Sequence, residues 1–237
     1  MENYTFAFQP IVDVSRRCCT GFEALVRGPA DEAARFVLAS YRITQTSLFE
    51  FDAAARERAI ALASDIGLPK DAYLSLNLLP ASLEEMGDAP FESTMAAIER
   101  SRISPRQIVI EVSESERIAD FRRFYAMANQ YRARGLRFAL DDFGAGYAGL
   151  NLLAEFQPDL IKLDMSLVTR IWERGPRQAI IRGVIRTCED LGIDVVAEGV
   201  ESIEEYQWLR DENISMFQGY LFARPQFKAF SDANFPS

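Results

Sequence analysis

The sequence predicts an α/β fold, a modified (β/α)8 TIM-like barrel in which one early strand runs antiparallel. From Tyr73 onward, apolar runs of mostly four or five residues alternate with longer amphipathic segments. Short apolar runs are typical of strands buried on both faces of a parallel sheet. Their alternation with helices over this length favours a barrel, and a doubly wound open sheet is the alternative.

The elements can be placed in order along the chain. Two early strands, Phe6–Val14 and Gly21–Arg27, are joined by a polar turn, and a long helix covers Ser47–Ile66. The strands that follow are Tyr73–Asn77, Gln107–Glu111, Arg137–Asp141, Asp159–Lys162, Asp194–Glu198 and Met216–Phe222. Helices are expected near Phe91–Ser101, Ile118–Arg134, Pro176–Leu191 and Ile203–Glu212, of which the first three lead into Gly, Pro or Ser. Without a linker or low-complexity segment, residues 1–237 form one domain.

Composition narrows the classes of function. The 237 residues carry a formal net charge of -9, which argues against a DNA or RNA polymer as partner. A small anionic substrate is compatible with this charge if metal ions supply positive charge. No apolar run approaches the roughly 20 residues that span a bilayer. The cysteines, Cys18, Cys19 and Cys188, form no disulfide framework, so we expect reduced thiols and a cytoplasmic location.

The chain contains no histidine. This absence excludes Ser-His-Asp and Cys-His catalysis, zinc bound by histidine, and a histidine acid or base. Proton chemistry near neutral pH must therefore use carboxylates, lysine, tyrosine or water bound to a metal.

Polar residues lie at or near the carboxyl ends of the predicted strands. They are Asn77, Glu111, Asp141 with the adjacent Asp142, Lys162, Glu198 and Gln218, while Glu23 lies inside an early strand. All such strand ends converge on one face of a parallel barrel, where about five negative charges would meet one lysine. Two carboxylates about 4 Å apart repel by several kcal/mol at an effective dielectric constant of ~20, so the cluster must either take up protons or hold cations.

The donor atoms of this cluster indicate which cations it holds. Carboxylate and amide oxygens, without histidine or cysteine, favour magnesium, manganese or calcium over zinc. A pair of such ions suits the hydrolysis of a phosphodiester, since one ion can activate water while both stabilise the phosphoryl oxygens.

A set of motifs in a fixed order resembles one known family. The segment Glu23–Arg27, Glu-Ala-Leu-Val-Arg, resembles the signature of the EAL-domain cyclic di-GMP phosphodiesterases. The other motifs are Phe8–Val12, Asn77, Glu111–Glu114, Asp141–Tyr147, Lys162–Asp164, Ala197–Glu201 and Gln218–Phe222, in the family's order over residues from about 6 to 225. The three-letter string alone carries no weight, whereas the ordered set is specific.

The resemblance implies an enzyme that opens one phosphodiester of cyclic di-GMP to give linear pGpG. Two Mg²⁺ or Mn²⁺ ions per active site would activate the attacking water, and Ca²⁺ would inhibit. The residues implied for the first ion are Glu23, Asn77, Glu111 and Asp141, and those for the second are Asp141, Asp142 and Glu198, with Asp141 bridging. Lys162 would orient the attacking water or help to deprotonate it, so that Glu23, Lys162 and Glu198 are the implied catalytic residues.

Further residues are assigned by the same resemblance. Arg27 would contact a phosphate, and Gln9 and Gln218 would lie in the ligand groove. Asp164 would bind substrate near Lys162, although it is equally consistent with a carboxylate at the start of a loop. Glu114 would anchor the loop that follows Asp142 rather than bind a metal.

Alternatives and partners complete these expectations. Gly144–Gly149 matches the dinucleotide-binding glycine pattern, but Asp141 and Asp142 precede it and would repel a pyrophosphate. The serious rival is a catalytically weak or inactive EAL domain that acts as a cyclic di-GMP receptor or protein-interaction module.

The resemblance also implies a bacterial protein and a homodimer, with helices near Asp164–Leu191 as candidates for the interface. No sensory domain is visible, so either the protein stands alone or the chain belongs to a larger regulator.

Overall fold

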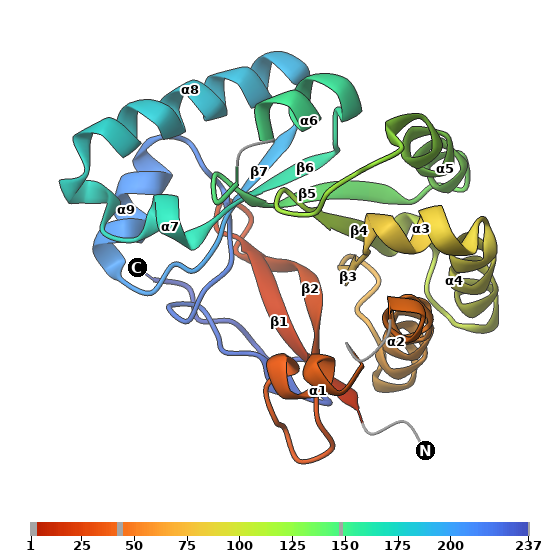
Figure 1. The fold of residues 1–237 in the computed structure, drawn as a ribbon. Helices are drawn as coiled ribbons and strands as arrows, with labels where there is room; N and C mark the ends of the chain where they lie inside the picture. The colour runs from red at the N-terminus through yellow and green to blue at the C-terminus, as the bar shows by residue number, and fades with distance from the viewer. Residues whose placement is uncertain (1–3, 42–44, 147–148, 237) are drawn as a thin grey trace.

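A closed barrel of eight strands forms the centre of the molecule, and helices surround it (Figure 1). The computed structural model describes residues 4–41, 45–146 and 149–236. The barrel strands are β1 (Thr5–Asp13), β2 (Cys18–Arg27), β3 (Tyr73–Asn77), β4 (Ile108–Ser113), β5 (Arg137–Phe143), β6 (Leu160–Leu163), β7 (Asp194–Ala197) and β8 (Met216–Phe217). Strands β2 to β8 follow one another in parallel, and β1 closes the ring between β8 and β2.

Strand β1 runs antiparallel to both of its neighbours in the ring. It forms a hairpin with β2 in which Gln9 lies opposite Glu23, and the two-residue strand β9 (Gln226–Phe227) is added to its edge. The prediction of a modified barrel with one early antiparallel strand is therefore confirmed. Cys18, Cys19 and Cys188 are free thiols, as predicted.

The helices pack on the outside of the barrel (Figure 1). They are α1 (Ala34–Tyr41), α2 (Gln45–Ile66), α3 (Pro80–Met86), α4 (Ala89–Arg100), α5 (Phe121–Ala133), α6 (Gly149–Phe156), α7 (Met165–Val168), α8 (Gly175–Leu191) and α9 (Ile203–Asp211), with 3-10 turns η1 (Pro105–Gln107) and η2 (Ile171–Glu173). Predicted ends agree well where a stop residue is present: Gly192 closes α8 with φ 70°, a left-handed conformation that suits glycine.

Two expectations about the elements were incomplete. The short helices α1, α3, α6 and α7 were not predicted, because each has at most eight residues and little room for a periodic apolar pattern. The last strand was predicted over Met216–Phe222 but ends at Phe217. There the chain turns across the β7–α9 connection, where a side chain on Gly219 would come within 2.0 Å of the Val200 carbonyl oxygen.

An apolar layer fills the lower part of the barrel interior. Its buried residues are Ile11, Tyr73, Val109, Ala139, Leu160 and Val196, one from each of six strands, with Met216 of β8 packed against them. Larger apolar clusters fill the space between the strands and the surrounding helices. Because side chains alternate across a strand, the residue two positions further toward the same end of each strand points into the barrel as well.

No helix in the described part of the chain is long and apolar enough to cross a membrane.

Candidate metal centre

A layer of polar side chains lies directly above the apolar layer of the barrel. Five predicted site residues each follow a residue of the apolar layer by two positions. They are Glu111, Asp141, Lys162, Glu198 and Gln218, which follow Val109, Ala139, Leu160, Val196 and Met216 in that order. On the antiparallel strand β1 the same step is taken backward, from Ile11 to Gln9. The strand alternation that buries the core therefore also assembles the site at the carboxyl ends of the parallel strands.

The ammonium group of Lys162 lies at the centre of this layer. Its Nζ is 2.7 Å from Glu198 Oε1, 2.9 Å from Glu111 Oε1, 3.0 Å from Asp141 Oδ1 and 3.3 Å from Glu23 Oε2. Lys162 is only 1% exposed. Burial alone would lower its pKa, but the surrounding carboxylates hold the pKa well above its ordinary value. In this arrangement Lys162 is therefore a cation.

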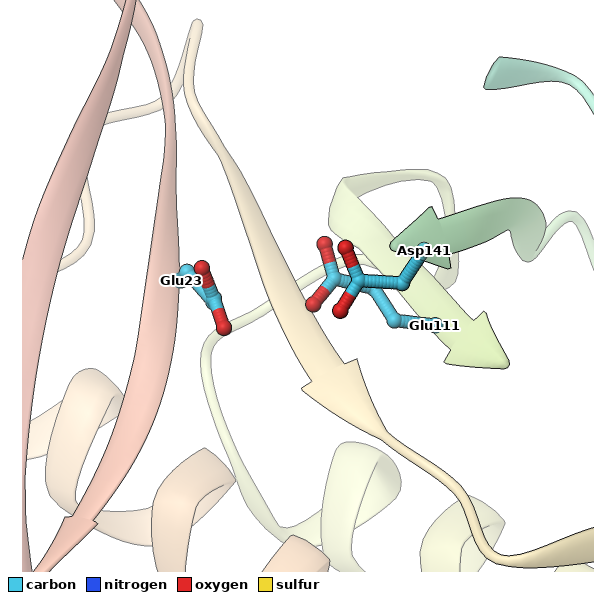
Figure 2. Close-up of side chains that lie close together, drawn as sticks. All are labelled: Glu23, Glu111 and Asp141. Atoms are coloured by element: carbon cyan, nitrogen blue, oxygen red, sulfur yellow. The ribbon is translucent and has the colours of Figure 1, made fainter. Parts of the chain in front are cut away.

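Glu111 is the most buried of the carboxylates. Figure 2 shows its carboxylate beside that of Asp141, both directed from β4 and β5 toward Glu23 on β2. Burial raises the pKa of Glu111 to about 8, and repulsion from Glu23 and Asp141 adds to this rise while Lys162 opposes it. Burial also raises the pKa of Glu198 well above its ordinary value. Glu111 and Glu198 thus resist ionisation even with Lys162 beside them.

Asp141 and Asp142 are consecutive, yet both carboxylates belong to the site. In a regular strand they would point to opposite faces. Asp142 instead has φ 55°, and the pairing of β5 with β6 shifts register between Leu140 and Phe143. Aspartate tolerates this left-handed conformation better than most residues. As a result, oxygens of Asp141, Asp142 and Glu198 lie within 4.8 Å of one another, as do oxygens of Glu23, Glu111 and Asp141.

A groove of about 290 Å³ opens above the carboxylates. The predicted site residues that line it are Gln9, Glu23, Asp142, Asp164, Glu198 and Gln218. Gln218 Nε2 donates to Glu23 Oε2 at 2.7 Å and lies 3.4 Å from Gln9 Oε1. Asp164 caps α7, accepting from the Ser166 N–H at 2.8 Å. Asp164 therefore both starts a helix and lines the groove, so the two interpretations of it are compatible.

Asn77 and Arg27 lie at the margin of this arrangement. Asn77 ends β3 and is paired with Glu111 of β4, with its side chain exposed. Arg27 ends β2; its guanidinium donates to the Val26 carbonyl oxygen at 2.8 Å and lies 3.6 Å from Asp31. Arg27 is not among the residues that line the groove in the described part of the chain.

The donor set fits a pair of hard divalent cations. Among the described residues, the ammonium of Lys162 approaches Glu111 Oε1 at 2.9 Å and Asp141 Oδ1 at 3.0 Å, whereas the buried Glu111 Oε2 has no hydrogen-bond partner. Buried polar atoms of this kind normally have partners. If all are ionised, five carboxylates and one ammonium leave four negative charges, which is the charge that two divalent ions neutralise. All-oxygen ligands suit Mg²⁺, Mn²⁺ or Ca²⁺.

Glu114 holds the loop that follows Asp142 through backbone hydrogen bonds. Its Oε2 accepts from the N–H groups of Gly144 at 2.6 Å and Gly146 at 3.2 Å, and its Oε1 accepts from Gly149 at 2.6 Å. A side chain on Gly149 would lie 2.7 Å from Glu114 Oε1, so glycine is required for this approach. This geometry supports the anchor role expected for Glu114; Tyr147 and Ala148 of the same motif lie outside the described residues.

Sequence reasoning assigned no role in the site to several residues that support it. Ser113 Oγ donates to Asp142 Oδ2 at 2.9 Å, and Met165, Glu201 and Tyr220 also line the groove. Ser113, Glu201 and Tyr220 stand within the quoted motifs, and Met165 follows one of them, so the motifs were the available signal. The buried pair Asp52 and Arg56 carries a fainter signal, two opposite charges four residues apart on an alanine-rich helix.

The fold and the site define a barrel with an acidic centre suited to divalent cations, and comparison with known proteins identifies its family. The EAL domain family matches residues 2–225. The chain therefore belongs to the EAL domain family.

Two curated relatives illustrate the range of proteins in which similar chains occur. The "Blue light- and temperature-regulated antirepressor BluF" of Escherichia coli is 37% identical over 234 residues, covering 99% of this chain and 57% of BluF. The "Cyclic di-GMP phosphodiesterase RocR" of Pseudomonas aeruginosa is 32% identical over 193 residues, covering 80% of this chain and 47% of RocR. The chain thus spans about half the length of these relatives.

Solved structures resemble the whole fold. BlrP1 of Klebsiella pneumoniae, in a complex with manganese and cyclic di-GMP, has a TM-score of 0.88 and 42% identity, covering 98% of this chain and 58% of BlrP1. A calcium and cyclic di-GMP complex of BlrP1 is equally similar. A standalone EAL protein from Vibrio cholerae, with cyclic di-GMP bound, has a TM-score of 0.90 and 37% identity, covering 98% of this chain and 96% of that protein.

Replacing Glu114 with glutamine should loosen the loop without removing a carboxylate of the metal centre. The amide has one acceptor oxygen in place of two, so at least one of three backbone donors loses a charge-assisted bond. We expect a loss of about 1.5–3 kcal/mol in the free energy of unfolding, together with weaker metal use, measured by urea unfolding and by Mn²⁺ titration. Glu155→Gln, on the exposed surface of α6, is the matched control; wild-type behaviour of Glu114→Gln would contradict the anchor role.

The raised pKa of Glu111 predicts how pH and metal together affect stability. Because the folded-state pKa, about 8, exceeds its ordinary value of 4.5, the stability contribution of Glu111 is full below pH 4.5 and is lost as pH rises toward 8. Bound cations would remove this penalty. We therefore expect the rise in Tm caused by Mn²⁺, relative to EDTA, to be larger at pH 8 than at pH 6. The difference should shrink in Glu111→Gln, and an equal rise at both pH values would refute the assignment.

Proposed function

We propose that this chain is a metal-dependent phosphodiesterase that hydrolyses cyclic di-GMP to linear pGpG. The observation that carries the proposal is the ring of carboxylates around Lys162, in which oxygens of Glu23, Glu111, Asp141, Asp142 and Glu198 gather in two overlapping groups and the ammonium of Lys162 contacts four of these residues. The name of RocR and the manganese and cyclic di-GMP complex of BlrP1 support it.

Two Mg²⁺ or Mn²⁺ ions would supply the Lewis acidity that makes water nucleophilic and stabilises charge on the phosphoryl oxygens. Glu23, Asn77, Glu111 and Asp141 would hold one ion. Asp141, Asp142 and Glu198 would hold the other, with Asp141 shared. Two groups of carboxylates, Glu23 with Glu111 and Asp142 with Glu198, each lie close to Asp141, which supports this division.

The side chains around the ions would bind and orient the reactants. Lys162, which its carboxylate neighbours hold at the centre of the site, would orient the attacking water or help to deprotonate it. Gln218, through its bond to Glu23, would fix the direction of that carboxylate. The groove formed by Gln9, Asp164 and Gln218 would receive the ligand, and Arg27 would contact a phosphate at the end of β2. Water then adds across one phosphodiester bond, and the departing oxygen takes up a proton.

A second candidate function follows from the similarity to BluF, whose name describes an antirepressor. In that case the chain would bind cyclic di-GMP, or a partner protein, without hydrolysing it. The two functions differ in turnover, since both can retain the barrel and the groove.

The chain is further proposed to act as one domain over residues 1–237 and to form a homodimer. Exposed Leu150 of α6 and Ile180 of α8, 69% and 53% exposed, support an apolar contact on that side of the barrel. Buried residues of these two helices belong to one apolar cluster. Light scattering on the purified chain would measure the oligomeric state, and a monomer at all concentrations would contradict the dimer.

The central experiment is incubation of the purified protein with cyclic di-GMP and Mg²⁺ or Mn²⁺, with chromatography of the products. We expect pGpG, its loss with EDTA, and inhibition by Ca²⁺. Lys162→Met and Glu23→Ala should lower turnover by at least about 100-fold, as when an essential electrostatic group is removed. Circular dichroism of each variant, with Glu155→Gln as a control, would show that the fold is retained.

The outcomes separate the two candidates. Binding of cyclic di-GMP by calorimetry without pGpG at saturating Mn²⁺ would reject the hydrolase and favour a receptor. No binding of the dinucleotide at all would leave the protein-interaction function as the better account.

A further inference from the structure

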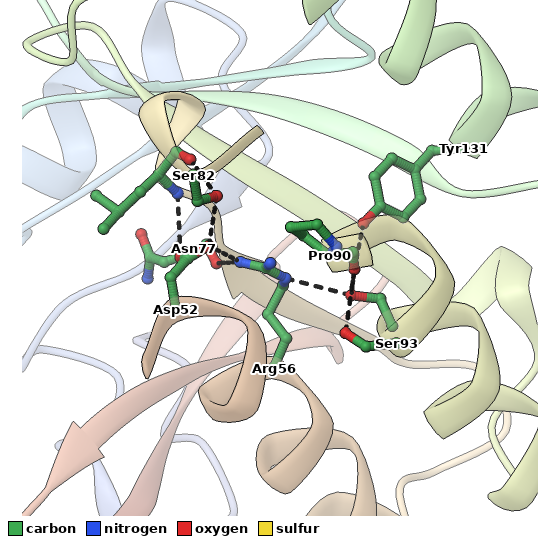
Figure 3. Close-up of polar contacts among 9 residues, drawn as sticks. Asp52, Arg56, Asn77, Ser82, Pro90, Ser93 and Tyr131 are labelled. Carbon is green, nitrogen blue, oxygen red and sulfur yellow. Dashed lines mark hydrogen bonds and ion pairs between the residues drawn. The ribbon is translucent and has the colours of Figure 1, made fainter. Parts of the chain in front are cut away.

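A buried ion pair on α2 holds the chain on both sides of Asn77. Arg56 Nη1 donates to Asp52 Oδ2 at 2.6 Å and to the Asn77 carbonyl oxygen at 3.2 Å. Asp52 Oδ1 accepts from the N–H of Leu79 at 3.1 Å. Asp52 and Arg56 are 6% and 2% exposed, so these bonds are shielded from water. Figure 3 shows the pair between α2 and the end of β3.

Toward β2, the end of β3 extends beyond the paired residues of the two strands. The ladder between β2 and β3 ends at Ser75, two residues before Asn77. On the other side, Leu78 donates its N–H to the carbonyl oxygen of Glu111 at 2.9 Å. Three consecutive backbone groups, the Asn77 carbonyl and the Leu78 and Leu79 N–H groups, are therefore fixed by Arg56, Glu111 and Asp52 in turn.

The network extends away from the site and braces the pair against other helices. Ser82 Oγ of α3 donates to Asp52 Oδ2 at 3.0 Å, and Arg56 Nε donates to Thr94 Oγ1 of α4 at 3.3 Å. Thr94 of α4 and Tyr131 of α5 both donate to the carbonyl oxygen of Pro90, at 2.8 and 3.3 Å respectively (Figure 3). Four helices thus fix the orientation of the guanidinium and carboxylate groups.

Stability alone does not explain a buried ion pair. Its desolvation costs several kcal/mol per ion, and replacing such pairs with apolar residues is often neutral or stabilising. The position of the Asp52–Arg56 pair beside Asn77 gives a better explanation. Asn77 would be the one neutral ligand of the ion held with Glu23, Glu111 and Asp141, and it is exposed. The backbone that carries it must therefore be held in place, and metal sites tolerate errors of only about 0.2 Å in ligand distances.

We infer that Asp52 and Arg56 are positioning residues that set the metal affinity of the Asn77 side of the centre. The inference rests on the proposed function, because it takes Asn77 as a ligand. It predicts an effect on one of two ions, exerted through Asn77 and not through the charge of either residue.

The test is Mn²⁺ binding by calorimetry to folded variants. Asp52→Asn combined with Arg56→Gln removes both charges and leaves the local net charge as it is in the wild type. We expect one of two Mn²⁺ ions to bind about 10- to 100-fold more weakly, the range typical of residues that orient metal ligands, while the second keeps its affinity. Turnover should fall at low Mn²⁺ and recover at high Mn²⁺.

Coupling to Asn77 separates positioning from a general loss of stability. In an Asn77→Ala background the same pair of substitutions should have no further effect on Mn²⁺ affinity, since the group being positioned is gone. Tyr131→Phe, which removes a hydrogen bond at the far end of the network, is the matched control and should lower Tm without changing either affinity. If the double variant does not fold, Ser82→Ala replaces it and should weaken the same ion to a smaller extent.

Three results would overturn the inference. Unchanged affinity for both ions in folded variants, with only Tm lowered, would show a purely structural role. Equal and additive losses in the wild-type and Asn77→Ala backgrounds would show an effect that bypasses Asn77. If the wild type itself binds no Mn²⁺ and makes no pGpG, the proposed function fails together with the inference, whereas a fully active wild type with unaffected variants refutes the inference alone.

Discussion

The repulsion among the carboxylates at the mouth of the barrel is the constraint on which the rest of the site depends. Two like charges about 4 Å apart cost about 4 kcal/mol at an effective dielectric constant of 20, and here oxygens of three carboxylates lie within 4.8 Å in two overlapping groups. Lys162 offsets part of this cost by contacting four carboxylates at once. Burial raises the pKa of Glu111 and Glu198, and the remaining repulsion adds to this rise. A folded chain can maintain such a cluster only with rigid support from around it.

That support comes from side chains that bind backbone groups at the ends of strands. Glu114 accepts three N–H groups of the loop after Asp142, and the Asp52–Arg56 pair holds the chain around Asn77. Glu205 of α9 acts in the same way, accepting from Arg170, Glu201 and Ser202 and so joining the segment after Asp164 to the segment after Glu198. Each is buried, and each fixes a segment adjacent to a predicted site residue.

The period of the strands explains how much of this could be predicted from the sequence. Glu111 and Lys162 follow short apolar runs, and a barrel brings such strand ends to one face, so their convergence could be predicted. The participation of both Asp141 and Asp142 was expected from their place at a strand end, but its geometry could not be derived from that period, because it depends on the left-handed conformation of Asp142 and the register shift beside it. The role of Arg56 could not be predicted, because its contact with Asn77 joins residues 21 positions apart. The acceptor is a backbone oxygen, which every residue type carries, so the sequence does not indicate it.

The position of Lys162 has a consequence for how the site accepts cations. Its ammonium lies within 3.3 Å of four of the carboxylates that would hold them, so those carboxylate oxygens must be shared between the lysine and the ions. A cation at the centre lowers the cost of folding around five carboxylates, but it also repels each incoming divalent ion. Affinity then depends on how far Nζ can withdraw while the ligands stay in place. Hydrogen bonds hold the strand ends around Asn77 and Asp142, whereas lysine carries its ammonium on a flexible four-carbon side chain. In the proposed site with two ions, the adjustment to the metal would therefore fall on this one long side chain.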